Sequence, residues 1–210
     1  MPNRGDRGGS KTRAHIADVA TGLFLDRGFD NVTLVEVARA AGVSKMTVLT
    51  HFDRKEDLLL DRLPDVVEIA RATVRERADD VGPVEAIRRT LLALTEERHG
   101  LSVLEEGIEP FMRVVMEAPT VIARLRVFEH EIEAALAEEL ESDKRFSGDS
   151  ALIAALVVAA YRVVAVATVR RRLAGDDLAD IATAHRQRLN QAFDAIEHGI
   201  SAAPRPIARL

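Results

Sequence analysis

The side chains best suited to chemistry gather in one short stretch in the first quarter of the chain. They supply three hydroxyl groups, a cation and an imidazole, and they are Ser44, Lys45, Thr47, Thr50 and His51. Such groups can donate hydrogen bonds to phosphate oxygens and to base edges in the major groove of DNA. The alternative is an ordinary helical hairpin with a solvated polar face, which any one of these residues alone would indicate. The spacing of the whole set favours the DNA-reading interpretation.

Two short helices that meet at a sharp turn are needed to hold these side chains. Thr33 and Glu36 have the spacing of a capping box, which satisfies free backbone amides at a helix start. Gly42 can adopt the left-handed conformation that ends this first helix. Ser44 can then cap a second helix over residues 45–51. The pattern therefore predicts a helix-turn-helix, with the second helix as the reading element.

A longer helix before this pair is predicted over residues 11–26. Its apolar residues, at positions 16, 19, 20, 23 and 24, recur at the spacing of one helical face, and Gly28 is a natural stop.

Residues 1–10 contain glycine and charge but no apolar run, which predicts a mobile arm. Basic residues near this end can add phosphate or minor-groove contacts, with a solvated tail as the alternative. These residues are Arg4, Arg7, Lys11 and Arg13.

The run from Phe29 through VTLVEVARAAGVSKMTVLTHF to Lys55, with the helix before it, resembles the DNA-binding domain of tetracycline-repressor-like (TetR-type) regulators. The resemblance covers about the first quarter of the chain. It implies that Thr33 touches a backbone phosphate, that the second helix enters the major groove, and that Lys55 grips another phosphate. The chain departs from the family at Leu49, where tyrosine is common, and at Met46, where a small residue is common. The expected DNA-binding residues are Thr33, Ser44, Lys45, Met46, Thr47, Thr50, His51 and Lys55.

Charge is divided unevenly along the chain. The 210 residues carry a net charge of -5, but residues 1–55 hold nine Lys and Arg against six Asp and Glu, whereas residues 56–210 hold 20 against 28. The end that carries the helix-turn-helix is therefore the basic end. There is no cysteine, so disulfide and thiol redox chemistry are excluded, and zinc would depend on histidine and carboxylates.

The remainder of the chain predicts a larger helical domain. Asp53 and Glu56 repeat the capping pattern before a helix that runs toward Asp79, and Pro64 should kink or split that helix near Leu63. Further helices are expected over residues 83–98, 110–117 and 119–141. The predicted organisation is an arm at 1–10, a helix-turn-helix domain at 11–60, a ligand-binding and dimerisation domain at 61–200, and a flexible tail at 201–210.

Residues 151–169 form an apolar run of nineteen residues with one charge, Arg162. The length alone would allow a membrane span. The arginine in the middle of the run, and the amphipathic helix that follows it, favour a buried helix of a bundle instead. The two helices, at about 149–173 and 177–198, carry more apolar surface than one small domain readily hides. We therefore expect a homodimer that pairs them with their two-fold copies, and no membrane partner.

Motifs of catalysis and of cofactor binding are missing from the sequence. It has no GxxxxGK loop, GxGxxG turn, GxSxG elbow or HExxH helix, and the six histidines are scattered. We therefore predict no catalytic residue, no metal site, no cofactor and no enzymatic activity. Two classes of function remain. One is a cytoplasmic ligand-responsive transcription regulator, by the resemblance a repressor; the other is an all-helical enzyme or small-molecule carrier with an incidental helix-turn-helix.

A regulator of this kind needs a site for its effector. The middle of the predicted domain is interrupted by Gly100, Gly107, Pro110 and Pro119, a segmentation that leaves room between helices. Large apolar residues between about Val84 and Tyr161 are candidates for lining that space, and plain core is the alternative for each. They are Phe111, Met112, Met116, Phe128 and Tyr161. We expect a mostly apolar effector and a joint at Pro64 that couples the effector to DNA binding. The complete prediction is an all-α protein that binds double-stranded operator DNA.

Overall fold

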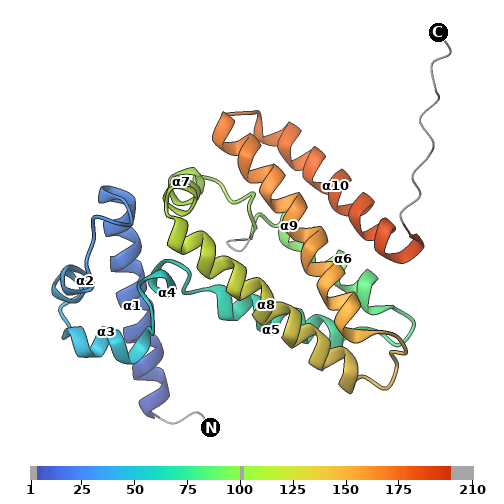
Figure 1. Ribbon diagram of the computed structural model, residues 1–210, viewed down its shortest axis with the longest axis horizontal. Helices are drawn as coiled ribbons and strands as arrows, with labels where there is room; N and C mark the ends of the chain where they lie inside the picture. The colour runs from blue at the N-terminus through green and yellow to red at the C-terminus, as the bar shows by residue number, and fades with distance from the viewer. Residues whose placement is uncertain (1–3, 100–101, 200–210) are drawn as a thin grey trace. The chain divides into compact units, whose positions relative to one another are not determined.

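The computed structural model describes residues 4–99 and 102–199, and in these ranges the regular structure is entirely α-helical (Figure 1). The predicted all-α class is confirmed. The helices are α1 (Arg4–Arg27), α2 (Leu34–Ala40), α3 (Lys45–His51), α4 (Lys55–Leu59), α5 (Leu63–Arg75), α6 (Pro83–Glu96), α7 (Glu109–Glu117), α8 (Pro119–Ser142), α9 (Ser150–Ala174) and α10 (Leu178–His198). The predicted tail at 201–210 lies outside the described residues.

The chain divides into two compact units that do not follow the predicted division at residue 61. The first unit joins residues 1–68 with residues 106–131, and the second joins residues 69–105 with residues 132–210. Segment 106–131 belongs to the first unit because apolar residues of α7 and of the start of α8 pack into the same core as α1 to α4. The division into DNA-binding and effector-binding functions stays a prediction.

The core of the first unit is built around α1. Ile16, Ala20 and Phe24 of this helix are completely buried, and the Phe24 and Phe29 ring centroids lie 4.9 Å apart. The spacing of 4 residues between the three α1 positions puts them on one face, as the sequence predicts. Val37 of α2 and Val48 of α3 bury themselves in the same cluster. One apolar face of α1 therefore holds both short helices in place.

Three boundaries in the first unit correct the sequence predictions. α1 begins at Arg4 and not near residue 11, so residues 4–10 extend a helix where a mobile arm is predicted. The N-cap of α4 is Arg54, without a side-chain cap, so Asp53 does not cap this helix. The chain splits between α4 and α5, and Pro64 lies in the first turn of α5, where its missing N–H removes no helical hydrogen bond. Of the two alternatives at Pro64, the split is confirmed.

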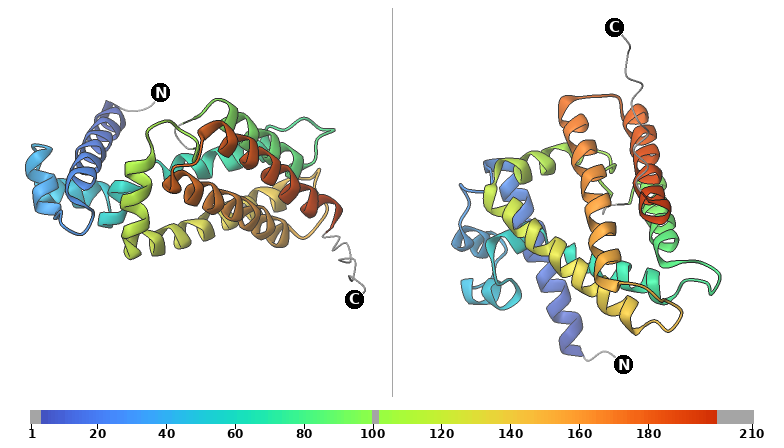
Figure 2. Two further views of the ribbon diagram at one scale, coloured as in Figure 1. Left: turned by 90° about the horizontal axis from the view of Figure 1, so that it is seen from above. Right: turned by 45° about the vertical axis from the view of Figure 1, so that its right-hand side comes forward.

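In the second unit α9 and α10 lie side by side and antiparallel, and α6 packs along α10 (Figures 1 and 2). Asp149 caps α9 and Asp177 caps α10 through their side chains. Gly175 has a φ of +83° and ends α9 in the left-handed conformation, which permits the tight turn between the two helices. The neighbouring Asp176, whose residue type and position would also suit a cap of α10, does not cap it, and its carboxylate binds Arg171 at 2.6 Å.

α9 contains the apolar run whose length would allow a membrane span. Among the described residues it alone is long and apolar enough to cross a membrane, a criterion that the core helix of a bundle also meets. Its inner face packs with α10 and α6 in the second core, through Ala154, Val157 and Val164. However, only 28% of its most apolar stretch is buried. α9 is therefore a bundle helix that leaves much apolar surface uncovered.

Candidate nucleic-acid interface

The first helix of the predicted motif begins with the capping box that the sequence indicates. The Thr33 amide donates to Glu36 Oε2 at 2.9 Å, and the Glu36 amide donates to Thr33 Oγ1 at 3.3 Å. The Thr33 hydroxyl also donates to Glu36 Oε2, at 2.8 Å, and the two hydrogen bonds that the carboxylate accepts from the Thr33 amide and hydroxyl hold the pKa of Glu36 below its usual value. An ionised carboxylate at a helix start also opposes the positive end of the helix dipole. The start of α2 is thus determined by two residues that are close in sequence.

The turn between α2 and α3 is formed by Gly42 to Ser44. Gly42 has a φ of +67°, a conformation that side chains with a Cβ rarely adopt. Val43 donates its amide to the Ala38 carbonyl at 3.0 Å, and its side chain packs against the core. Ser44 Oγ then accepts the Thr47 amide at 3.0 Å and starts α3. The predicted helix-turn-helix geometry is present.

The outer face of α3 is the surface that the motif presents to a partner. Val48 is fully buried and anchors the helix, while Lys45, Met46 and Thr50 are exposed, with 70% of Met46 accessible. Leu49 is also exposed. A short helix with one apolar anchor and small or flexible outer side chains can enter a major groove closely. This face carries no aromatic side chain at the position of Leu49, where the family commonly has tyrosine.

Two hydroxyl groups of α3 already have partners within the helix. Thr50 Oγ1 donates to the Met46 carbonyl at 2.9 Å, and the Thr47 and Ser44 hydroxyls lie 2.9 Å apart. A hydroxyl oxygen that donates its hydrogen retains lone pairs that accept from a base amino group. Thr50 is therefore oriented as an acceptor, whereas Lys45 has no hydrogen bond or ion pair with the residues described and remains a donor.

Lys55 and His51 are partly buried and already take part in contacts within the protein. The Lys55 ammonium donates to the Phe29 carbonyl at 2.5 Å and lies 4.2 Å from the Phe29 ring centroid, and partial burial lowers the pKa of Lys55. One of its three N–H donors is thus engaged. His51 is half-buried, and its carbonyl accepts a hydrogen bond from Arg13. All eight predicted DNA-binding residues remain predictions.

Two arginines with structural roles were missed or misread from the sequence. Arg13, for which phosphate or minor-groove contacts and a solvated position were the alternatives, stacks its guanidinium 4.0 Å from the Phe52 ring centroid and holds α1 against the end of α3. Arg124 of α8 donates to Asp57 at 2.7 Å and to Glu131 at 2.8 Å. Arg124 thereby ties α8 to α4. Such pairs join residues far apart in sequence, so no local spacing indicates them.

A cavity of about 320 Å³ lies in the first unit where α1, α3, α4, α5 and α8 meet. Its lining includes Pro64, the predicted joint, together with Phe52 and Arg124. Phe128 also lines this cavity, whereas the other four predicted effector residues do not. The cavity brings the predicted joint and a predicted lining residue together within one unit.

The other predicted effector residues are not gathered around this cavity. Phe111 packs against the core of the first unit, Met112 is buried, and Met116 is 46% exposed. Tyr161 packs against the core of the second unit. The five residues thus occupy different environments in two units, and their role in effector binding stays a prediction.

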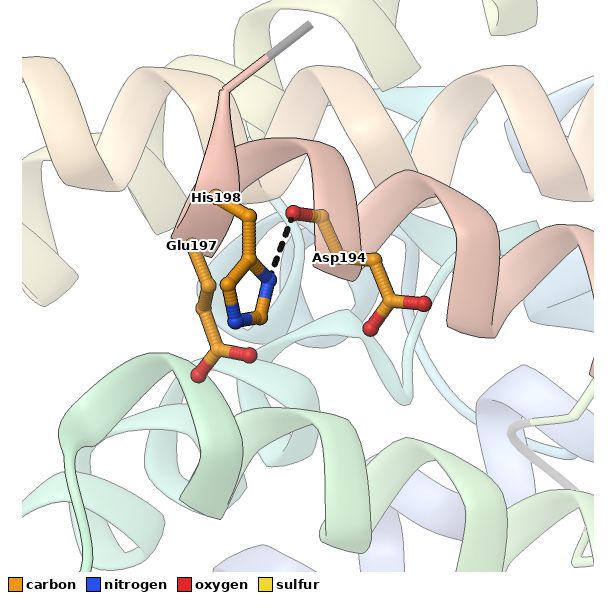
Figure 3. A group of neighbouring side chains, drawn as sticks. All are labelled: Asp194, Glu197 and His198. Atoms are coloured by element: carbon orange, nitrogen blue, oxygen red, sulfur yellow. Dashed lines mark hydrogen bonds between the residues drawn. The ribbon is translucent and has the colours of Figure 1, made fainter. Parts of the chain in front are cut away.

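One cluster near the end of α10 has the residue types of a metal site. The possible ligand atoms of Asp194, Glu197 and His198 lie within 4.8 Å of one another (Figure 3). However, Arg88 of α6 binds Asp194 at 2.7 Å and also binds Glu197. His198 Nδ1 donates to the Asp194 carbonyl at 3.1 Å. Because the carboxylates are exposed and neutralise Arg88, the cluster is an ion-pair network that ties α10 to α6.

The capped corner and its exposed polar helix define a helix-turn-helix DNA-binding domain. Comparison with known proteins finds a family that this region matches: residues 16–61 fit the description "Bacterial regulatory proteins, tetR family". The helix-turn-helix region is thus similar to that of the tetR family. The chain is 35% identical over 101 residues to the HTH-type transcriptional regulator TtgR of Pseudomonas putida, a match that covers 46% of this chain and 47% of TtgR. The chain spans about half the length of the curated relatives it matches.

Solved structures extend the likeness to the whole fold. NalD of Pseudomonas aeruginosa, the secondary repressor of the MexAB-OprM multidrug efflux pump, has a TM-score of 0.57 at 20% identity, over 88% of this chain and 96% of its own. FadR of Thermus thermophilus, a transcriptional repressor in complex with lauroyl-CoA, has a TM-score of 0.56 at 24% identity, over 92% and 98%. At such identities the likeness establishes a common architecture and nothing more.

Proposed function

We propose that this protein is a ligand-responsive transcriptional regulator that binds operator DNA through α3 and represses transcription until a small molecule releases it. The exposed outer face of α3, on a corner that is capped at both helix starts, carries the proposal. The basic charge of residues 1–55 supports it, because cations near the reading helix attract the phosphate backbone. The relatives are named as transcriptional regulators and not as enzymes, which argues against the alternative of an enzyme. A regulator of this kind works in the cytoplasm.

The second part of the proposal is a homodimer through α9 and α10. Leu152, Leu156 and Val163 of α9 are 54%, 39% and 64% exposed. Their spacing of four and seven residues places them along one side of the helix, the pattern of a helix that packs against another helix. A two-fold copy of the α9–α10 pair would cover this side in a four-helix interface. Dimerisation would also let two copies of α3 reach successive major grooves, about 34 to 36 Å apart.

The third part of the proposal is a mostly apolar effector. The FadR structure contains lauroyl-CoA, a molecule with a long apolar chain, which supports an effector with a large apolar portion for this protein as well. The cavity lined by Pro64 and Phe128 supports a coupling between ligand binding and the helix-turn-helix, because its walls come from both α1 and α8. A ligand that binds the non-reading conformation more tightly lowers operator affinity, and coupling of about 1 to 3 kcal/mol is enough for a switch.

The coupling can be tested at the break between α4 and α5. We expect Pro64→Ala to leave ligand affinity measurable but to change the effect of the ligand on DNA binding, because the proline stiffens the first turn of α5. Operator affinity of both proteins is measured with and without a ligand found by thermal-shift screening. An equal ligand effect in both proteins would contradict a joint at Pro64, and the absence of any active compound would weaken the sensor proposal.

Selection of bound duplexes from a random library tests the DNA-binding proposal. We expect enrichment of a near-palindrome whose half-sites are centred one helical turn apart. The recovered sequences can then be located upstream of genes to name the regulated targets. A library that shows no enriched sequence after repeated rounds would contradict a specific operator.

A further inference from the structure

The outward face of α3 carries two large apolar side chains. Val48 is fully buried and defines the inner side of this helix. A residue two positions away lies about 200° round an α-helix, so Met46 and Thr50 point almost directly away from the core. Met46 is 70% exposed, more than any other large apolar side chain among the described residues, and Leu49 is 39% exposed. A partner that lies against α3 therefore meets methionine and leucine as well as polar groups.

The hydroxyl groups of the same face are already engaged within the protein. Thr50 Oγ1 donates to the Met46 carbonyl at 2.9 Å. The Ser44 and Thr47 hydroxyls lie 2.9 Å apart, and Ser44 Oγ also accepts the Thr47 amide at 3.0 Å. The hydroxyl hydrogen of Thr50 and one hydrogen of the Ser44–Thr47 pair are thus used inside the protein. Fewer donors are left with which α3 can read bases.

The residue types of α3 restrict hydrogen-bond readout further. In the major groove, arginine or lysine recognises guanine, asparagine or glutamine recognises adenine, and aspartate or glutamate accepts from cytosine. The sequence of α3 is KMTVLTH, which contains lysine and none of the others. Guanine thus has one dedicated partner on this helix, Lys45, whereas adenine and cytosine have none.

Thymine presents an apolar group in the major groove, its C5 methyl. An apolar side chain that is pressed against a polar base edge removes water without supplying a hydrogen bond, which costs free energy. The same side chain gains the free energy of apolar burial when it packs against a methyl group. Met46 is also unbranched and flexible, so it can adjust to the position of such a group. The exposed apolar atoms of α3 are thus matched to thymine.

We propose that Met46 and Leu49 read thymine in the operator by packing against its C5 methyl group. The proposal rests on the proposed function, in which α3 binds operator DNA, and it adds the kind of base pair that the helix selects. A methyl contact, and not a hydrogen bond, then specifies those positions of each half-site.

Uracil is the direct probe, because it lacks the C5 methyl of thymine and keeps every hydrogen-bonding group. The full chain is titrated with the selected duplex and with duplexes in which one thymine at a time is replaced by uracil. We expect at least one replacement in each half-site to weaken binding about fourfold, the change in affinity that one buried methyl group supplies. At the same position, 5-methylcytosine should bind about fourfold more tightly than cytosine.

Substitutions of the two side chains connect the methyl effect to α3. At each methyl-sensitive position we expect either Met46→Ala or Leu49→Ala to bind the thymine and uracil duplexes equally, because the side chain that contacts the methyl group is gone. Both residues are exposed and alanine favours helix, so the variants should fold. Leu25→Ala is the matched control, because Leu25 lies on α1 and is 42% exposed, close to the value for Leu49. This control should retain the preference for thymine.

A selected duplex in which every thymine can be replaced by uracil without loss of affinity would overturn the methyl contact and leave the proposed function intact. Met46→Ala and Leu49→Ala variants that both retain the full preference for thymine over uracil would also overturn it, because another group would then contact the methyl. If no specific duplex can be selected at all, the proposed function fails together with the methyl contact. The two failures are therefore distinguishable.

Discussion

The α2–α3 corner and the α9–α10 pair are both two-helix elements joined by a short turn, yet their outer faces differ. The corner exposes short polar side chains around one buried valine, Val48. The α9–α10 pair exposes leucine and valine, and it buries a histidine nitrogen that has no partner. The first surface suits a hydrated, charged partner such as DNA. The second surface exposes apolar side chains to water, which is unfavourable unless a partner covers them. A DNA-reading helix and a dimer interface therefore place opposite demands on a helix surface.

The largest expected effect is on the free energy of unfolding, and it tests whether the α2–α3 corner and the α9–α10 pair are stabilised by separate hydrophobic cores. Phe24 and Phe193 are both completely buried, one in each unit. Replacing either with alanine should cost about 3 to 5 kcal/mol. Hydrogen exchange should show that Phe24→Ala weakens protection in α1 to α4, and that Phe193→Ala weakens protection in α9 and α10. Leu25→Ala is the control, because Leu25 is 42% exposed. Loss of protection throughout the chain in both variants would show one cooperative core instead of two.

The next effect tests the exposed side of α9. Val163→Arg places a charge where we propose that a second copy packs, and an unpaired charge buried in an interface costs about 3 to 5 kcal/mol. Sedimentation should show a folded monomer, and operator affinity should fall at least about a hundredfold, or about 2.7 kcal/mol. Val127→Arg is the matched control, since Val127 is also an exposed valine, on α8, with 51% of it accessible against 64% of Val163. A dimer that survives Val163→Arg would place the interface elsewhere.

The smallest effect concerns single side chains of the reader. Replacing Thr47 or Thr50 with alanine should change the preferred operator sequence, with a cost of about 1 to 3 kcal/mol at the affected base pair. Replacing Lys55 with alanine should weaken all sequences alike. Thr183→Ala is the control for Thr50→Ala, because each threonine donates to the carbonyl four residues earlier at 2.9 Å. Binding profiles over variant duplexes measure the preference. An unchanged profile in both α3 variants would remove these threonines from the reading set.

The corner was predictable from the sequence because its determinants are local. Thr33 with Glu36, the glycine at position 42 and Ser44 each act within four residues along the chain. Pro119 likewise begins α8 where the sequence predicts a helix start. Local hydrogen bonds and backbone preferences suffice for such features, so helix starts and turns can be found without the structure.

The interactions that the sequence could not reveal join distant residues. Arg124 reaches Asp57 across 67 positions, and the pairing of Thr168 with His185 depends on how α10 folds back on α9. Asp53 failed as a cap because the neighbouring Arg54 takes the extended conformation at the start of α4. Charged residues are frequent in this chain, so their types alone do not show which pairs meet. The candidate reader was therefore accessible from the sequence, and the packing of α10 against α9 was not.

The central claim is that two copies of α3 read one near-palindromic duplex. The direct measurement is a titration of the selected duplex, and of the same duplex with one half-site scrambled, at several salt concentrations. We expect two chains per intact duplex, at least about tenfold weaker binding to the scrambled duplex, and affinity that falls steeply as salt rises. One chain per duplex, equal affinity for both duplexes, or affinity that does not change with salt would contradict it.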